Sequence, residues 1–109
     1  MIKRFYEPVP QNVKENVKRY LEENNLGELV DVMRHSDNPK DDYLYHVIAR
    51  KPNTNKYFHN GEWDYRCWTS WNETTKSLNF GHYSIETEEE ARKICDEYFY
   101  KMTGAHVID

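Results

Sequence analysis

A thiol and an imidazole come close together in one predicted hairpin. Cys67 lies in a run of strand-forming residues, and the turn formers of Asn72–Lys76 fold the next run back against it. This pairing places Cys67 nearly opposite Gly81 or His82, and a thiol beside an imidazole can act as a nucleophile when its pKa is lowered. Cys67 alternates with residues that we expect to face the core. We therefore predict a buried, unreactive thiol and no catalytic residue, with a Cys-His hydrolase-type enzyme as the less favoured alternative.

Other catalytic and metal-binding signals are missing from the sequence. It holds no phosphate loop, dinucleotide fingerprint, nucleophile elbow or His-Glu-x-x-His pattern. The five histidines are scattered singly, and no Cys or His pair has the spacing of zinc ligands. We expect no metal and no cofactor. The second cysteine, Cys95, falls in a predicted helix, and we expect both thiols to be reduced and buried.

A second constellation combines a tryptophan with arginines. Alternate residues of a strand point to opposite sides, so Trp63 and Trp71 would face the core while Trp68 faces away from it. A guanidinium group can stack on an indole ring and can grip a carboxylate or phosphate. Even-numbered positions of neighbouring strands add further candidates, and the predicted binding site is Trp68, Arg66, Arg50, Arg34 and His46. The alternative is that the arginine stems only cover the apolar residues of a solvated face.

Two amphipathic helices enclose the strands in the sequence. Apolar residues recur at helical spacing between Gln11 and Asn25, and Gly27 is placed to end that helix in a left-handed conformation. Before the second helix, predicted at Glu88–Thr103, Thr87 and Glu90 have the spacing of a capping box. The acidic residues at its start are therefore explained by capping and by the helix dipole.

The strand signals predict an antiparallel sheet. Runs rich in β-branched and aromatic residues, separated by turn formers, occur at Leu29–His35, Tyr43–Arg50, Glu62–Trp71 and Ser77–Ile85. Asn60-Gly61 leaves open a fifth strand at Lys56–His59. In the last run a bulge at Gly81 would bring its apolar residues to one side. We predict an α+β fold, a two-layer sandwich in which a four-stranded (or five-stranded) antiparallel meander packs one face against both terminal helices.

Composition limits the function classes. The 109 residues form a single predicted domain, 1–109, and no run approaches the roughly 18 apolar residues of a membrane span. A net charge of −4 argues against coating nucleic acid through bulk charge. We expect a small, soluble, cytoplasmic, non-enzymatic protein that binds a protein partner or forms a homodimer through the open sheet face. The alternatives are a module that binds single-stranded nucleic acid through the same face, and an acidic inhibitor of a nucleic-acid-binding enzyme from a mobile element.

Overall fold

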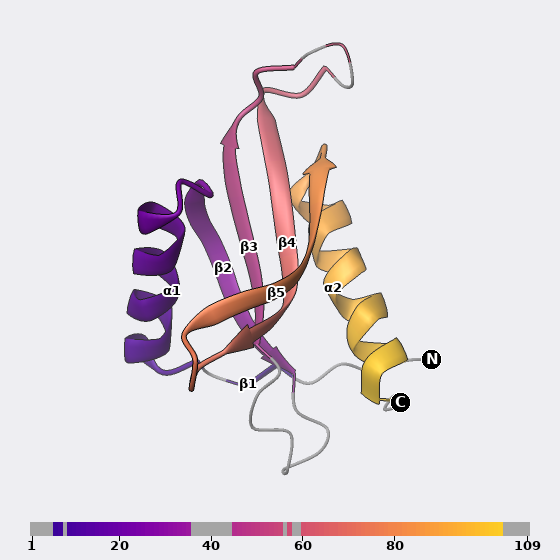
Figure 1. Ribbon diagram of the computed structural model, residues 1–109. Helices are drawn as coiled ribbons and strands as arrows, with labels where there is room; N and C mark the ends of the chain where they lie inside the picture. The colour runs from indigo at the N-terminus through magenta and orange to yellow at the C-terminus, as the bar shows by residue number, and fades with distance from the viewer. Residues whose placement is uncertain (1–5, 8, 36–44, 56, 58–59, 104–109) are drawn as a thin grey trace.

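The chain forms an open antiparallel sheet with a helix near each end (Figure 1). The computed structural model describes residues 6–7, 9–35, 45–55, 57 and 60–103. In chain order the elements are β1 (Tyr6–Glu7), α1 (Gln11–Glu23), β2 (Glu28–His35), β3 (Tyr45–Pro52), β4 (Trp63–Asn72), β5 (Ser77–Ile85) and α2 (Glu88–Thr103). The strands lie side by side in the order β1-β2-β3-β4-β5, so the predicted α+β class and the meander are confirmed.

The two helices cover opposite faces of the sheet. Val47 and Ile48 are consecutive in β3 and both are fully buried, yet Val47 packs in a cluster with α1 and Ile48 in a cluster with α2. Figure 1 shows the sheet standing between α1 and α2. The prediction of two layers with both helices on one face is therefore wrong, and the molecule has three layers. The burial pattern of β3 agrees with this, because Tyr45–Ala49 is buried without interruption, as in strands covered on both sides.

α1 uses one apolar stripe and ends two residues earlier than predicted. Its buried residues are Val13, Val17 and Leu21. The left-handed residue that closes it is Asn25, with φ of 53°, and not Gly27. Gly27 has φ of 114° and leads the chain into β2. An added Cβ there would lie 2.6 Å from the backbone oxygen of Arg50, so the glycine lets the chain pass close to β3.

α2 begins and ends where the sequence predicts. The backbone N–H of Glu90 donates to the Thr87 hydroxyl at 3.2 Å, which is one of the two bonds of a capping box. Arg92 donates to Asp31 of β2 at 2.8 Å and to Glu88 at 2.9 Å, so this guanidinium ties the helix to the sheet. Within the described ranges neither helix has the length and apolar character needed to cross a membrane.

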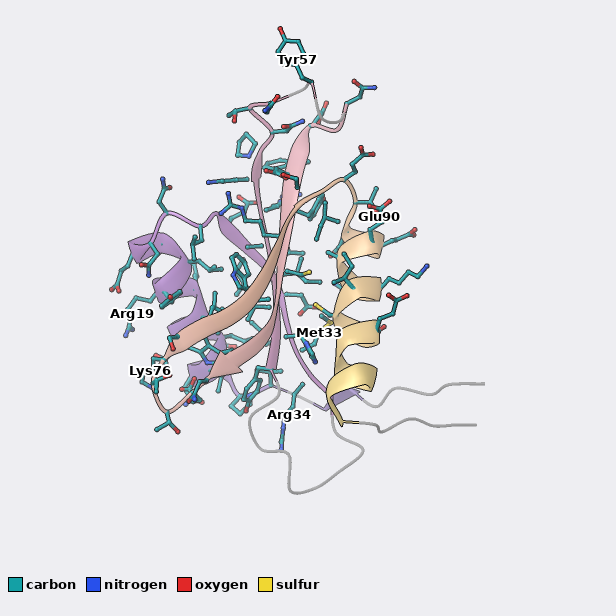
Figure 2. All side chains as sticks on the ribbon, turned by 45° about the vertical axis from the view of Figure 1, so that its right-hand side comes forward. Arg19, Met33, Arg34, Tyr57, Lys76 and Glu90 are labelled. Atoms are coloured by element: carbon teal, nitrogen blue, oxygen red, sulfur yellow. The ribbon has the colours of Figure 1, made fainter. Side chains whose placement is uncertain are left out.

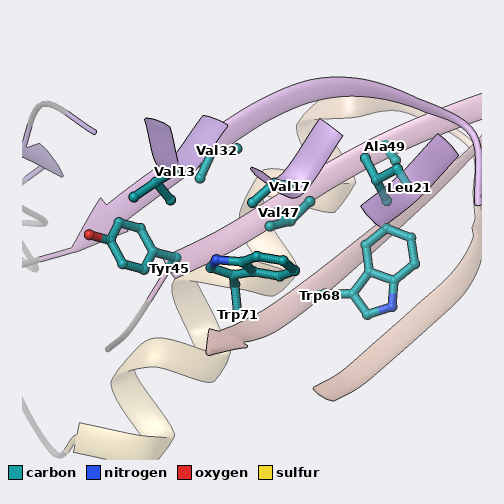
Figure 3. Close-up of a cluster of buried hydrophobic side chains, with 9 residues drawn as sticks. All are labelled: Val13, Val17, Leu21, Val32, Tyr45, Val47, Ala49, Trp68 and Trp71. Atoms are coloured by element: carbon teal, nitrogen blue, oxygen red, sulfur yellow. The ribbon is translucent and has the colours of Figure 1, made fainter. Parts of the chain in front are cut away.

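A bulge in β4 turns Trp68 and Trp71 toward the same cluster. Tyr45 pairs with Trp71 and Val47 with Trp68, so β4 has one more residue than β3 between these pairs. Both indoles pack beneath α1 (Figure 3). Gly81 pairs with Trp68 across the strands, and a Cβ at this glycine would lie 2.6 Å from the indole nitrogen. The glycine therefore makes room for the ring.

The irregularity predicted at Gly81 lies further along β5. Tyr65 pairs with Ile85 and Cys67 with His82, so the extra residue of β5 falls between His82 and Ile85. Ser84 takes the left-handed conformation there, with φ of 60°. The strained backbone conformation therefore occurs at Ser84, whereas the bulge was predicted at Gly81.

The fifth strand of the sheet is not the one that the sequence suggested. β1 pairs with the end of β2, joining Tyr6 to His35 and Glu7 to Arg34. Of the suggested strand Lys56–His59, only Tyr57 is described, and it lies in a turn; the other positions lie outside the described residues.

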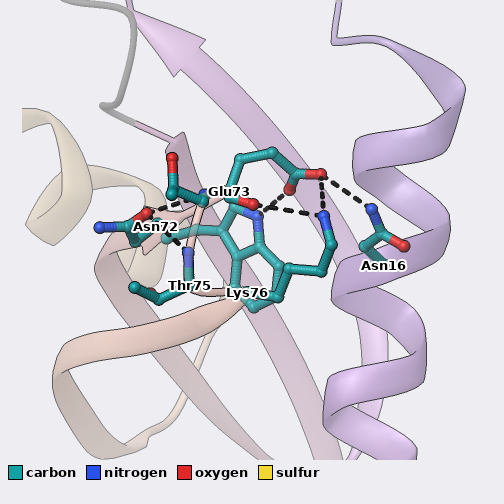
Figure 4. A network of polar contacts seen from close by, with 7 residues as sticks. Asn16, Asn72, Glu73, Thr75 and Lys76 are labelled. Atoms are coloured by element: carbon teal, nitrogen blue, oxygen red, sulfur yellow. Dashed lines mark hydrogen bonds and ion pairs between the residues drawn. The ribbon is translucent and has the colours of Figure 1, made fainter.

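The turn between β4 and β5 is fastened to α1 by one carboxylate (Figure 4). Glu73 accepts hydrogen bonds from Trp71 Nε1 at 2.6 Å, Asn16 Nδ2 at 2.8 Å and Lys76 Nζ at 3.1 Å. Partial burial by itself raises the pKa of the Glu73 carboxyl, but the hydrogen bonds from Trp71, Asn16 and Lys76 outweigh it and hold this pKa below its ordinary value of 4.5. The ionised form of Glu73 is therefore the one that stabilises the fold.

Glu73 should make stability fall on acidification. Because the folded-state pKa is depressed, its contribution is fully present above the unfolded value of 4.5 and is lost as pH falls through the folded value. We expect Glu73→Gln to cost about 1–2 kcal/mol of unfolding free energy at neutral pH, since a neutral amide is a weaker acceptor for these donors. Urea unfolding of both proteins, from neutral pH down to below 4.5, should show the difference shrinking. A difference that stays constant with pH would assign the loss to geometry and not to charge.

Candidate protein-interaction site

The five residues predicted to share an open face are divided between the two faces of the sheet. Trp68 is only 4% exposed, in the cluster beneath α1, and His46 is fully buried on the opposite face. Arg34 pairs with Tyr45 and Arg66 with Ala49, so these arginines share the face of Trp68. Arg50 shares the face of His46. The predicted surface around Trp68 therefore does not exist.

Register is the reason for this error. After the bulge between Leu29 and Asp31, even positions of β2 pair with odd positions of β3, as Val32 with Val47 and Arg34 with Tyr45. Assigning the odd-numbered residues of all strands to one face therefore mixes residues from the two faces of the sheet. In β4 the bulge before Trp71 again reverses which face the odd-numbered residues occupy. Neither the register nor the bulge has a local signal that a count of alternate positions can detect.

Arg50 does lie beside a tryptophan, but the tryptophan is Trp63. Its guanidinium carbon sits 4.0 Å from the centre of the Trp63 ring. Arg50 Nε donates to Glu28 of β2, and Tyr65 of β4 is a second hydrogen-bond partner. The bonds to Glu28 and then to Tyr65 raise the pKa of Arg50 above its ordinary value, so the guanidinium stays charged. We call Glu28, Arg50, Trp63 and Tyr65 the arginine–aromatic cluster.

The cluster is open to solvent. Arg50 and Glu28 have side chains that are 36% and 56% exposed, while Trp63 and Tyr65 are half-buried. Its members come from three adjacent strands, because Glu28 pairs with Arg50 and Arg50 with Tyr65. The sequence pattern assigned Trp63 to the core, because Trp63 shares the parity of Cys67. Cys67 is covered by α2, whereas the cluster lies further along the same face, toward the loop that joins β3 to β4.

The loop that joins β3 to β4 extends this surface. Asn53 organises its base: its backbone N–H donates to Glu62 O at 2.9 Å, and its side-chain amide donates to Gly61 O at 2.9 Å. At the far end of the loop Tyr57 is 99% exposed, and Figure 2 shows its ring pointing away from the rest of the molecule. A well-anchored loop thus presents an aromatic ring to solvent.

A cleft of about 510 Å³ lies between α1 and the start of β2. Its lining includes Lys18 and Glu22 of α1, followed by Gly27, Glu28 and Leu29. Charges of both signs line it beside Leu29. It is relevant because Glu28 both lines the cleft and holds Arg50.

The cysteine and the histidine considered for catalysis occupy paired positions in neighbouring strands. Cys67 pairs with His82, as the hairpin predicted. The Cys67 side chain is fully buried, and the His82 side chain lies outside what the structure describes. Among the described residues no three His, Cys, Asp or Glu side chains gather as a metal ion would require.

The comparisons with known proteins give one family. The model of the family described as Large polyvalent protein associated domain 24 matches residues 12–89. The search of curated proteins and the search of solved structures each found no match. The matched residues run from α1 to the first residues of α2 and include the whole arginine–aromatic cluster. Because the match covers well over half of the chain, the protein belongs to the family of Large polyvalent protein associated domain 24.

Proposed function

We propose that this domain is a non-enzymatic protein-binding module whose partner docks on the arginine–aromatic cluster. The observation that carries the proposal is the packing of Arg50 against Trp63 on a solvent-exposed part of the sheet, with Tyr65 bonded to the same guanidinium. Trp, Tyr and Arg are the residue types that dominate the binding energy of protein interfaces. Here they are already held by Glu28 and by one another, so binding loses little side-chain entropy.

A protein partner fits this surface better than single-stranded nucleic acid does. The rings of Trp63 and Tyr65 could stack on bases, but Arg50 is already paired with a carboxylate, and a phosphate would have to displace Glu28. The chain as a whole has a net charge of −4, which repels a polyanion.

The partner can be found by crosslinking from the exposed loop. A photoreactive amino acid at position 57, in protein produced in its native host, should capture the partner, while the same group at the exposed position 15 of α1 should not. Affinity for the purified partner is then measured for Arg50→Ala and Trp63→Ala. We expect each to lose roughly tenfold or more, the scale of an interface hot spot. Arg19→Ala is the matched control, because Arg19 is an exposed arginine on α1.

The other occupants of the surface are separate outcomes of the same experiment. A crosslink between two copies of the chain, together with a dimer in analytical ultracentrifugation that Trp63→Ala dissociates, identifies a homodimer. Capture of an oligonucleotide, with affinity that falls steeply as salt rises, would replace the proposal by nucleic-acid binding. Unchanged affinity of both variants for the captured partner would remove the cluster from the interface.

A further inference from the structure

The two cysteines meet in the interior between α2 and the sheet. Cys67 of β4 and Cys95 of α2 are both fully buried and belong to one apolar cluster. Their side chains are hydrogen-bonded to each other, and neither cysteine is part of a disulfide. The rest of the cluster is apolar, with Ile48, Ile85 and Ala91 around them. The only two cysteines of the chain therefore touch across the boundary between a helix and the sheet.

We propose that Cys67 and Cys95 are an oxidation site, at which a reversible disulfide links α2 covalently to β4. The inference is independent of the proposed protein-binding function, since the arginine–aromatic cluster includes neither cysteine. Packing alone does not require cysteine at these positions, because an alanine or valine would fill the same interior space without reactivity. A disulfide gives the contact between the two cysteines a chemical role.

The oxidant that balances the reaction is a low-molecular-weight disulfide such as oxidised glutathione. One cysteine loses its proton, and its sulfur attacks the small disulfide to form a mixed disulfide, which releases the first small thiol. The other cysteine then attacks the protein sulfur of the mixed disulfide and releases the second small thiol. In sum the protein loses two protons and two electrons, one S–S bond forms between the Sγ atoms, and the small disulfide is reduced to two thiols.

Burial makes this reaction slow in the folded protein. The hydrogen bond with Cys67, followed by burial, raises the pKa of Cys95 above its ordinary value of 9.0, so the thiolate that reacts is scarce. A small disulfide reaches the pair only when α2 lifts from the sheet, which requires breaking the Arg92–Asp31 ion pair. The site thus reports on the opening of α2, and its rate should increase as pH rises and the thiolate fraction grows.

The bond also joins the matched part of the chain to the helix that lies mostly beyond it. Cys67 lies within residues 12–89 of the family match, and Cys95 lies outside them. Once formed, the disulfide closes the segment from Cys67 to Cys95 and limits the freedom of the unfolded chain. We expect the melting temperature of the oxidised monomer to exceed that of the reduced protein by roughly 10 °C.

The test is equilibration of the intact chain with oxidised and reduced glutathione at defined ratios under native conditions. Mass spectrometry of the wild-type monomer should show the loss of two hydrogen atoms, and peptide mapping without reductant should show Cys67 joined to Cys95. Dithiothreitol should reverse both changes and the shift in melting temperature. In Cys67→Ala and Cys95→Ala, the remaining thiol should yield only a glutathione adduct.

Three results would overturn the proposal. Wild-type thiols that stay reduced until denaturant is added would show that the folded protein cannot form the bond. A glutathione adduct that persists on one cysteine would show that the second cannot reach it. A disulfide that lowers the melting temperature would show that its geometry does not suit the native packing. The main measurement is made on wild-type protein, so a variant that fails to fold does not affect the conclusion.

Discussion

Replacing Trp71 by alanine is expected to lower the free energy of unfolding by about 3–5 kcal/mol. The Trp71 ring is completely buried, packs edge-on against Tyr20 of α1 at 5.5 Å between centroids, and donates its indole N–H to Glu73. The truncation leaves a cavity beneath α1 and removes one donor of the carboxylate that holds the β4–β5 turn. A domain of this size has only about 5–10 kcal/mol of stability, so the variant should be close to unfolding at room temperature.

Trp68→Ala should cost nearly as much, although strand alternation alone predicts a small effect. Its indole is 4% exposed and lies in the same cluster beneath α1 (Figure 3). The third tryptophan is the matched control: Trp63 is half-buried at the surface, and Trp63→Ala should cost about 1 kcal/mol through its contact with Arg50. Urea unfolding of the three variants gives the ranking. If Trp68→Ala lowered the unfolding free energy as little as Trp63→Ala does, the placement of Trp68 in the buried cluster would be wrong.

Gly27→Ala is also expected to have a large effect, about 2–4 kcal/mol of destabilisation. Two independent costs add at this position. The φ of 114° is a conformation that an L side chain rarely adopts, and the added Cβ would lie 2.6 Å from the backbone oxygen of Arg50. The Arg50 backbone is part of the β3 ladder, so it cannot yield without disturbing the sheet between α1 and α2.

Gly81→Ala separates these two costs. Its Cβ would meet the Trp68 indole nitrogen at 2.6 Å, which is as close as the contact at Gly27, but the atom that must move belongs to a side chain. We expect a smaller loss, about 1–2 kcal/mol, with the indole shifting in its pocket. Thermal or urea unfolding of both variants gives the comparison. Equal losses would indicate that steric contact dominates and that the backbone conformation of Gly27 contributes little.

The elements themselves could be predicted because their signals are local. β5 and α2 begin and end at the predicted residues, and the other predicted elements differ by one or two residues at their ends. The apolar period of α1, the turn at Asn72–Lys76 and the acidic start of α2 each act within a few neighbouring residues. A stretch of sequence read by itself is therefore sufficient for them.

The residue types of the candidate site could be predicted, but the residues that come together there could not. A tryptophan stacked beside an arginine on the sheet was expected, and Arg50 belongs to such a pair, but its partner is Trp63 and not Trp68. Glu28 and Tyr65 were not among the predicted site residues. They are separated from Arg50 by 22 and 15 positions along the chain and join it only through strand register. No local pattern in the sequence predicts that strand register.

Sequence periodicity alone determined that this chain forms two helices around an antiparallel meander, since helical and extended patterns follow from the spacing of apolar residues. The tertiary structure decided which face each residue occupies. Pairing between distant strands and the bulges in β2, β4 and β5 set the phase of each pleat, and burying apolar residues on both sides of β3 requires one helix on each face. These are contacts between distant parts of the chain, and only the folded arrangement brings them about.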